Sequence, residues 1–343
     1  LVAIGDEALR NNTSADANIG IGFQALHDNT TGTRNLAIGF QALDNADTES
    51  DNIAIGYDAL GGSVAGGEKN VVIGNYAGDS ITSAGNNSLY GYNSGTSLTV
   101  GGYNAFFGAY SGENTTQASY NVAIGYAASE NNTQSGRITA IGAFSGQSGG
   151  GSYSTYLGYA AGRFSTGERN VIIGDTAATN ASGTKNIVIG QNAQGSNLTG
   201  DGNVIIGYDT DAPSSSGSRQ LILSGNDGTT TTTWITGNSD GNVKLNQLAD
   251  VITVNSNTTL TQAQSGSYVY WTSGTLTLPD GCEAGTQFTI FNNTGSNATV
   301  ALNTNGVMNI GWAANAAVAD NDATSYVCTG EAAGASYWVQ VGA

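Results

Sequence analysis

The chain has 343 residues, with nine Lys or Arg against 26 Asp or Glu, and its formal net charge at pH 7 is -17. So few cations exclude the basic surface on which binding to nucleic acid or to an anionic membrane depends. No apolar run approaches the ~20 residues of a membrane helix, so membrane insertion is not expected either.

Glycine is abundant, with 51 copies, and its placement is periodic. Each repeat glycine ends a short apolar run, such as the Leu-Ala-Ile before Gly39. A unit this short cannot bury its own apolar side, so neighbouring units are expected to stack. The spacing predicts an all-β chain whose residues 1–210 form a parallel β-roll, or β-solenoid, of about thirteen coils. The thirteen glycines recur every 16 to 18 residues, at Gly5, Gly22, Gly39, Gly56, Gly74, Gly91, Gly108, Gly125, Gly142, Gly158, Gly174, Gly190 and Gly207.

The alternation of side chains along each predicted strand defines two faces. The residues one and three positions before the glycine are mostly large and apolar, as in Ile38 and Leu36, and we expect them to face the inside of the solenoid. The residue between them, such as Ala37 or Ile172, would then face outward, yet it is apolar as well. Apolar runs of this kind belong to strands buried on both faces. We therefore expect the outer face to pack against other copies, most simply in a parallel homotrimer.

Asparagine stands four residues before the glycine in ten of the thirteen coils. Stacked amides can form a hydrogen-bond ladder along the solenoid axis, so the expected role is structural. With about 4.8 Å between stacked strands, thirteen coils span about 60 Å, which is typical of a spacer. The residues that represent this repeat are Asn35, Gly39, Asn52, Gly56, Asn121, Gly125, Asn186 and Gly190.

Aromatic residues follow the repeat glycine in several coils, and we expect their rings to form a discontinuous column along the solenoid. The column could serve stability alone, or it could present a stripe to carbohydrate. Its members are Phe23, Phe40, Tyr57, Tyr92, Tyr126, Tyr159 and Tyr208.

The glycine spacing fails after Gly207, and we interpret residues 211–250 as a cap and neck. All four tryptophans lie beyond the solenoid. Residues 251–343 contain about seven short apolar runs with turn signals between them, which predicts a C-terminal β-sandwich or jelly-roll tip. These runs are 251–254, 268–271, 275–278, 287–291, 298–302, 326–328 and 337–341.

Six aromatic residues of the tip could offer flat faces to sugar rings, although about half of them are expected in its core. They are Tyr268, Tyr270, Trp271, Trp312, Tyr337 and Trp338.

Residues for metal or nucleophilic chemistry are scarce. His27 is the only histidine and lies in a polar linker, where we expect it to be solvated. Cys282 and Cys328 are far apart in sequence and supply no zinc spacing, so they form either a disulfide or two buried thiols. No metal, cofactor or catalytic residue is expected.

Carboxylate pairs are the remaining catalytic candidates, because paired Asp or Glu side chains hydrolyse glycosidic bonds. The pairs lie in predicted turns where solvation explains them, so we expect no enzymatic activity. They are Asp6 with Glu7, Asp47 with Glu49, and Asp209 with Asp211.

The repeat Asn-x-Ala-Ile-Gly-x-x-Ala resembles the head repeat of trimeric autotransporter adhesins, which form left-handed parallel β-rolls wound as trimers. Variants such as Gly39-Phe-Gln-Ala-Leu43, joined by linkers such as Asn29-Thr-Thr-Gly32, also resemble repeats of bacteriophage tail fibres. Autotransporter heads continue into a coiled-coil stalk and a membrane anchor, and this chain shows neither heptads nor a lipid-facing alternation. The C-terminal runs instead resemble the β-rich tips of phage fibres.

The resemblance implies a non-enzymatic fibre of a phage virion. Its expected partners are two further copies of itself, a host cell-surface glycan or protein, and other tail proteins reached through an N-terminal region that is missing here. The alternatives are the head of a trimeric autotransporter adhesin on a bacterial cell surface and a polysaccharide-cleaving tailspike.

Overall fold

The structure is a computed structural model. It describes residues 1–134, 136–148, 151–245, 251–279, 286–295, 298–302, 306–308, 317–318, 323–332 and 335–341. The chain divides into two compact units, Leu1–Asn246 and Gln247–Ala343. Each unit is considered by itself below.

The first unit is a single sheet whose strands follow one another in chain order. Its strands are β1 (Val2–Ile4), β2 (Ile19–Ile21), β3 (Leu36–Ile38), β4 (Ile53–Ile55), β5 (Val71–Ile73), β6 (Ser88–Tyr90), β7 (Ala105–Phe107), β8 (Val122–Ile124), β9 (Thr139–Ile141), β10 (Thr155–Leu157), β11 (Val171–Ile173), β12 (Ile187–Ile189), β13 (Val204–Ile206), β14 (Leu221–Asn226), β15 (Thr231–Gly237) and β16 (Val243–Leu245).

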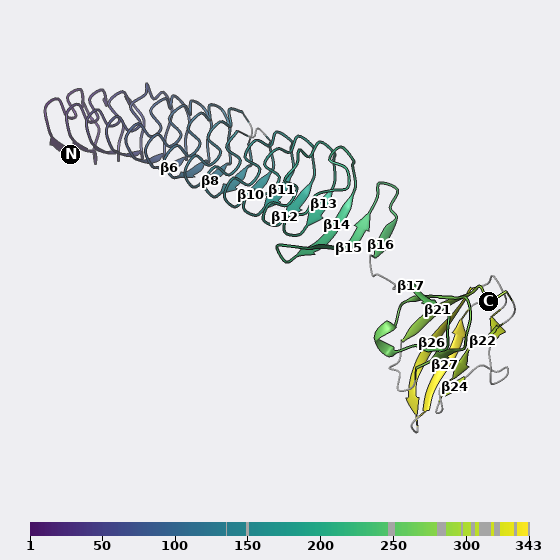
Figure 1. Cartoon of the computed structure of the whole chain (residues 1–343). Coiled ribbons are helices and arrows are strands. Elements are labelled where there is room, and N and C mark those ends of the chain that lie inside the picture. The colour runs from purple at the N-terminus through teal and green to yellow at the C-terminus, as the bar shows by residue number, and fades with distance from the viewer. Residues whose placement is uncertain are drawn as a thin grey trace. The chain divides into compact units, whose positions relative to one another are not determined.

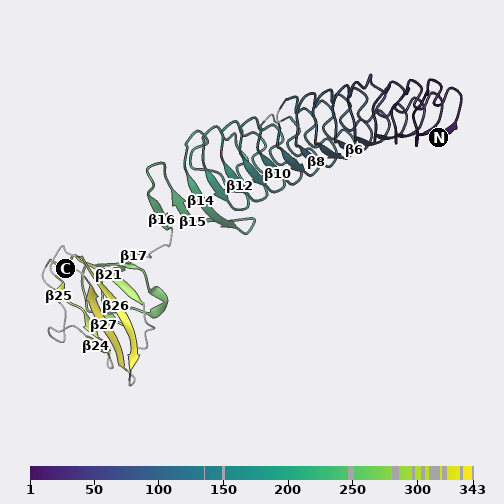
Figure 2. The same cartoon turned by 180° about the vertical axis from the view of Figure 1, so that it is seen from behind.

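Strands β1 to β14 pair in parallel, one strand per coil, as Figures 1 and 2 show from opposite sides. The register keeps equivalent residues opposite each other, for example Leu36 opposite Ile53 and Val204 opposite Leu221. The ladder ends in an antiparallel meander of β14, β15 and β16. The predicted all-β parallel solenoid is confirmed, and its parallel ladder continues through β14, one strand beyond the thirteen predicted coils.

The predicted assignment of the two strand faces is wrong. The middle residue of the strand faces the core: Ala37, Ala54 and Phe106 are fully buried. The residues on either side of it, such as Leu36 and Ile38, are only half-buried. Because coils this small enclose a narrow core, small residues such as alanine are accommodated inside. The larger Ile, Leu and Val side chains therefore form the outer surface of the sheet, here termed the strand face.

The strand middle and the next turn share the same core space, and their side-chain sizes compensate. Coils with Ala37 or Ala54 in the strand have a buried leucine, Leu43 or Leu60, four residues after the repeat glycine. The coil with Phe106 has Gly112 at that turn position, where an added Cβ would lie 2.4 Å from the Phe106 ring. In these coils the core is therefore filled by one large side chain, contributed by either the strand or the turn.

The repeat asparagines form the predicted ladder, mainly through the backbone. Asn35 Oδ1 accepts a hydrogen bond from the Asn52 N–H (2.9 Å), and Asn35 Nδ2 donates to the Glu49 carbonyl (2.7 Å). The same hydrogen bond recurs along the sheet: Asn121 Oδ1 accepts from the Ile138 N–H, and Asn186 Oδ1 accepts from the Asn203 N–H. Each buried amide is thus satisfied by the following coil, which ties adjacent coils together.

The repeat glycines are required by the close approach of successive coils. Gly39 has φ +143°, and a Cβ there would lie 2.0 Å from the carbonyl oxygen of Gly56 in the next coil. A side chain at this position would meet both left-handed strain and a backbone clash.

The second unit contains 11 described strands and one short 3₁₀ helix. They are β17 (Val251–Val254), β18 (Thr258–Thr259), η1 (Gln262–Gln264), β19 (Tyr268–Trp271), β20 (Leu276–Leu278), β21 (Gln287–Asn292), β22 (Ala298–Thr299), β23 (Ala301–Leu302), β24 (Gly306–Met308), β25 (Ala317–Val318), β26 (Ala323–Ala332) and β27 (Ala335–Val341).

The strands of the second unit form a six-stranded sheet, β17-β19-β21-β26-β27-β24, a three-stranded sheet, β18-β20-β23, and a two-stranded sheet, β22-β25. Strands β17, β19 and β21 pair in parallel, as do β18, β20 and β23, so this unit also begins with stacked coils. Residues of both parallel sets, including Val269 and Leu276, share one apolar core. Each of the seven predicted runs overlaps a described strand, whereas β18, β24, β25 and the parallel pairing were not predicted.

Cys328 lies in this core and is disulfide-bonded, which selects one of the two alternatives left open by the sequence. The other cysteine, Cys282, lies outside the described residues.

Candidate functional site

The six aromatic residues predicted for the tip do not all share one surface. Tyr268 and Tyr270 lie on the exposed side of β19, with 59% and 37% of their surface accessible, and Tyr270 stacks on Phe291. Trp271 points the opposite way, is only 2% exposed, and donates its indole N–H to the Gly274 carbonyl (3.0 Å). It is a core residue rather than a ligand-binding face.

The other three predicted tip residues add no described surface. Tyr337 and Trp338 belong to β27, but their side chains lie outside the described part of the structure. Trp312 lies outside the described residues.

The aromatic column that was expected to be discontinuous is continuous over nine coils. Tyr76, Tyr110 and Phe144, each two residues after a repeat glycine, fill the gaps between the residues one after it. Successive ring centroids are 5.0 to 6.0 Å apart, and the contacts change from stacked to edge-on along the column. The members in order are Phe23, Phe40, Tyr57, Tyr76, Tyr92, Tyr110, Tyr126, Phe144 and Tyr159. Because these rings are half-exposed, the column can either stabilise the stack or contact a partner.

Tyr208 stands apart from this column. Two coils separate it from Tyr159, and they carry Asp175 and Gln191 directly after their glycines. The interruption is therefore a property of the sequence between 160 and 207.

A second exposed column lies at the other end of the strands, five residues before each repeat glycine, and the sequence analysis missed it. The Tyr103 and Tyr120 rings stack 5.0 Å apart and 1° from parallel. The guanidinium of Arg137 lies over the rings of Tyr120 and Tyr153, at 5.8 and 5.1 Å from their centroids, and that of Arg169 lies 5.1 Å from the Tyr153 ring. Aligning the coils on their glycines would have revealed this column in the sequence.

A groove runs beside the second column. One stretch of about 400 Å³ reaches from Lys69 to Tyr120, and the next, of about 250 Å³, reaches from Tyr120 to Tyr153. Both are lined by Ser119 and Tyr120, so the two stretches adjoin along the column, and together they are termed the groove.

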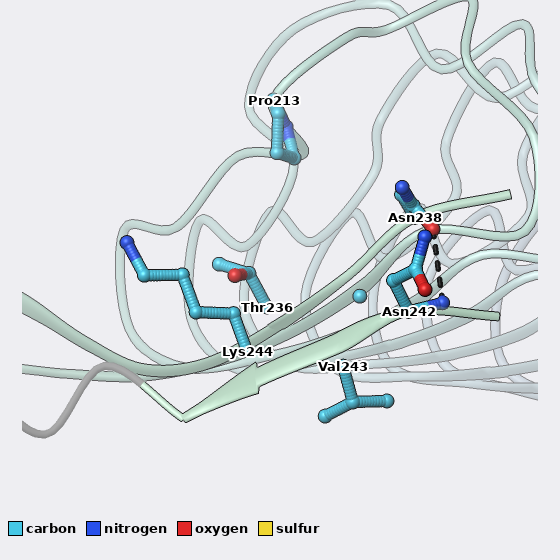
Figure 3. Close-up of a pocket in the computed structure, with 7 residues that line it drawn as sticks. Pro213, Thr236, Asn238, Asn242, Val243 and Lys244 are labelled. Atoms are coloured by element: carbon cyan, nitrogen blue, oxygen red, sulfur yellow. Dashed lines mark hydrogen bonds between the residues drawn. The ribbon is translucent and has the colours of Figure 1, made fainter. Parts of the chain in front are cut away.

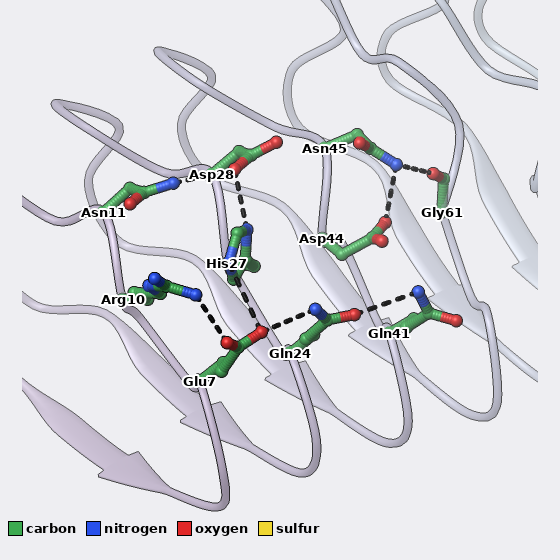
Figure 4. A network of polar contacts seen from close by, with 10 residues as sticks. All are labelled: Glu7, Arg10, Asn11, Gln24, His27, Asp28, Gln41, Asp44, Asn45 and Gly61. Carbon is green, nitrogen blue, oxygen red and sulfur yellow. Dashed lines mark hydrogen bonds and ion pairs between the residues drawn. The ribbon is translucent and has the colours of Figure 1, made fainter.

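His27 belongs to a polar network at the turns of the first coils rather than to a solvated linker (Figure 4). Its Nδ1 lies 2.7 Å from Asp28 Oδ1, and its Nε2 lies 3.7 Å from Glu7 Oε2. Glu7 also pairs with Arg10 and accepts a hydrogen bond from Gln24 (2.7 Å). The hydrogen bond from Gln24 is the main reason that the pKa of Glu7 is lowered.

Asp44 lies in the same region, where Asn45 Nδ2 donates to it (2.8 Å) and also to the Gly61 carbonyl (2.7 Å). Burial raises the pKa of Asp44 to about 6, and the neighbouring Asp58 carboxylate adds to the effect. Burial also raises the pKa of Asp58 and of Asp79. These carboxylates are partly desolvated by the stacking of the coils.

The carboxylate pairs considered from the sequence contribute to loop structure. Glu49 is buried and accepts hydrogen bonds from the backbone N–H groups of Asp47 (3.0 Å), Thr48 (3.1 Å) and Gly66 (2.8 Å). Asp209 accepts one from Asn192 Nδ2 (2.5 Å). Their hydrogen-bond capacity is used to fix turns between coils.

A shallow cavity of about 350 Å³ lies at the end of the first unit (Figure 3). Pro213 faces Thr236 and Lys244 across it, and Asn238 Oδ1 accepts a hydrogen bond from the Asn242 N–H (3.1 Å). Lys244 is the only charged residue among the described residues that line it. This cavity lacks the convergent polar groups of the groove.

Within the described residues, no three His, Cys, Asp or Glu side chains are grouped so that they could hold a metal ion. The same residues include no helix of sufficient length and apolarity to traverse a membrane. No protein-family model, curated protein or solved structure matches the chain.

Proposed function

We propose that the chain is a non-enzymatic structural and adhesive fibre protein of a phage virion. In this proposal three parallel copies form the shaft through residues 1–210, and the tip at residues 251–343 contacts a host surface glycan or protein. Other tail proteins would be contacted through a region outside this sequence.

The observation that carries the proposal is the apolar strand face. The residue preceding each repeat glycine is large and apolar in all thirteen coils, and Ile4, Phe107, Ile124 and Leu157 are exposed. Stacked at about 4.8 Å, these residues form a continuous apolar surface about 60 Å long. A surface of this size on a single soluble chain marks an interaction site. Three is the number of copies that the resemblance to trimeric β-roll heads implies.

Two further observations support a fibre with a tip. The segment that follows the solenoid forms β-strands, and the one described helix, η1, has three residues. This favours a phage fibre over an autotransporter head, whose continuation is a coiled-coil stalk. Tyr268 and Tyr270 supply an exposed aromatic surface on the second unit.

The native mass of the purified chain, measured by sedimentation equilibrium, tests the proposal. We expect the mass of three 34.6 kDa chains. Repeating the measurement without residues 251–343 shows whether the tip is needed to bring three chains into register. A single-chain mass for the full protein would remove the basis of the fibre proposal.

The solenoid fits an adhesin head equally well, so the complete gene must distinguish the two. A downstream heptad stalk and membrane anchor would establish the adhesin and contradict the phage fibre. Sustained release of reducing ends from host polysaccharide would instead establish a cleaving tailspike.

A further inference from the structure

The second exposed column gathers most of the positive charge of an acidic chain. Six of its nine Lys and Arg residues occupy the position five residues before the repeat glycine or, before β14, its equivalent. They are Arg34, Lys69, Arg137, Arg169, Lys185 and Arg219. The backbone at all six is left-handed, with φ between 56° and 62°. The coil geometry therefore turns each of these side chains outward at the same edge of the sheet.

Arg137 differs from Arg34 and Arg169 of the same column, because each of those two arginines has a carboxylate partner. Arg34 binds Asp51 through two hydrogen bonds (2.6 and 2.8 Å), and Arg169 pairs with Glu168 (3.2 Å). Arg137 is held between two tyrosine rings and donates to the Tyr153 hydroxyl (2.8 Å). Across residues 1–134, 136–148 and 151–245, no carboxylate lies within 4.0 Å of it. Within these ranges its guanidinium is thus oriented without a counter-ion.

Small side chains account for the groove next to Arg137. The residue six positions before the repeat glycine is Gly or Ser in five consecutive coils, and all five line the groove. They are Gly85, Gly102, Ser119, Gly136 and Ser152. Glu68 and Glu168 occupy the same position in the coils on either side. These five positions are therefore uncharged, while Glu68 and Lys69 line one end of the groove and Glu168 lies in the coil beyond the other end.

The column also limits how a ligand can bind. Tyr103, Tyr120 and Arg137 use their flat faces to stack on one another, so those faces are not free for a sugar ring. Apart from the exposed Val100, what remains toward solvent is polar: phenolic hydroxyls, serine hydroxyls and the N–H edge of the guanidinium. That edge matches the geometry of a carboxylate, which it can bind through two parallel hydrogen bonds.

These features select among anionic polymers. The groove crosses several coils, so it accommodates a chain rather than a small molecule. A net charge of -17 and the acidic residues at both ends oppose a ligand with a charge at every unit, such as nucleic acid. A polymer rich in hydroxyls with separated carboxylates satisfies the hydroxyl-lined groove and its one unpaired guanidinium.

We propose that the groove beside Tyr103, Tyr120, Arg137 and Tyr153 binds an acidic polysaccharide, with Arg137 holding a uronate carboxylate. The inference deepens the proposed function and rests on it, since it assigns a glycan site to the shaft in addition to the tip. Three copies of a weak site in a trimer would raise the overall affinity by about 10² to 10⁴.

The test uses the full chain and a set of uronate oligosaccharides built from galacturonate, from glucuronate, and from mannuronate with guluronate. We expect at least one to bind by isothermal titration calorimetry. The Arg137→Gln variant should bind it at least tenfold more weakly, and carboxyl reduction of the oligosaccharide should cause a similar loss. Arg34→Gln, which removes a cation from the same column outside the groove, should leave the affinity within twofold.

Arg137→Lys is a second variant that keeps the charge and loses the planar fork. We expect it to bind more weakly than the native chain, and an unchanged melting temperature would show that neither variant acts by unfolding. Failure of all the uronate oligosaccharides to bind, or native affinity in Arg137→Gln, would overturn the site. Preferential binding of a single-stranded oligonucleotide would overturn it in favour of nucleic acid.

The native mass of each variant separates the two proposals. A trimer that binds none of the oligosaccharides would remove the glycan site and leave the fibre standing. A single-chain mass would contradict the fibre whatever the binding result.

Discussion

Bulky side chains in left-handed backbone are the main residue-scale cost of this fold. Tyr103, Tyr120 and Tyr153 have φ of 62°, 64° and 62°, a conformation that costs about 1–2 kcal/mol per non-glycine residue. The same coil position is left-handed at Gly202 as well, with φ 68°, so the turn geometry and not the side chain imposes it. Tyrosine at this position therefore carries a backbone strain that glycine would avoid, and this strain is offset by ring stacking on the neighbouring coil.

Asp44 predicts a pH dependence of stability. Its folded pKa of about 6 lies above the ordinary value of ~3.9, so the folded state favours the protonated acid. Stability is therefore lost as the pH rises from about 4 to about 6. Because the group is only half-buried, solvent screening reduces the effect to on the order of 1 kcal/mol.

Asp44→Asn should accordingly stabilise the chain by about 1 kcal/mol at pH 8 and have almost no effect near pH 3.5. Asn45 can still donate to the new amide oxygen, so its hydrogen bond is kept. Urea denaturation at the two pH values measures the difference. Asp240→Asn removes the same charge from an exposed turn and serves as the control; an equal gain there would point to net charge and not to burial of Asp44.

At the scale of the element, strand and turn compensate for each other's side-chain size in the coil that contains Phe106. Phe106 lies against Gly95 and Gly112, where an added Cβ would approach its ring to 3.2 and 2.4 Å. Phe106→Ala should cost about 3–5 kcal/mol through the cavity it leaves. Gly112→Leu alone should also destabilise, because the leucine has no space beside the ring.

The double variant Phe106→Ala with Gly112→Leu should recover more than half of the loss. It recreates the pairing of Ala37 with Leu43, whose backbone is also left-handed, with φ 51°. The denaturation midpoints of the two single variants and the double variant form a double-mutant cycle. Additive losses would show that strand and turn do not share one core space.

The sequence predicts the coils well because the glycine and asparagine positions are dictated by close backbone contacts. The prediction of which strand face is inside was wrong, because both faces are apolar and alternation alone cannot choose between them. A usable signal was present: Asn35 and Ala37 are two residues apart and so lie on the same face, and a ladder of buried amides places that face inward. The same alternation separates Trp271 from Tyr268 and Tyr270.

The columns were harder to predict because they lie at turns, where the period of two does not apply. Arg137 and Tyr153 become neighbours only when coils of unequal length are aligned on their glycines. Among the residues that the structure describes, the absence of a carboxylate within 4.0 Å of Arg137 depends on side-chain positions in three coils, which no pattern within a single coil reveals.

For the whole molecule, the decisive question is what covers the strand face. In a trimer its apolar residues would be buried between copies, and a charge placed there would lose its hydration without a partner. The pair of changes Ile55→Asp and Ile124→Asp should therefore leave single chains at micromolar concentration. Sedimentation equilibrium measures the outcome.

The matched control is Val100→Asp with Tyr208→Asp, which adds the same charge at exposed apolar positions outside the strand face. We expect the control to remain a trimer. Equal dissociation of both double variants would mean that charge repulsion and not burial separates the chains, and it would place the contact elsewhere.

The size compensation inside the coils also bears on how the number of coils can change over evolutionary time. The repeat glycines Gly22, Gly39 and Gly56 follow at 17-residue spacing, and their coils have similar cores, with a small middle strand residue (Gly20, Ala37 or Ala54) and a leucine in the turn (Leu26, Leu43 or Leu60). Unequal recombination that deletes or duplicates one of these coils therefore brings together neighbouring coils with similar cores. Tyr156 instead occupies space left by both Gly146 and Gly162, in two successive coils, so losing either coil leaves its ring without room. Length variation among natural versions of this chain should therefore be concentrated toward its first coils.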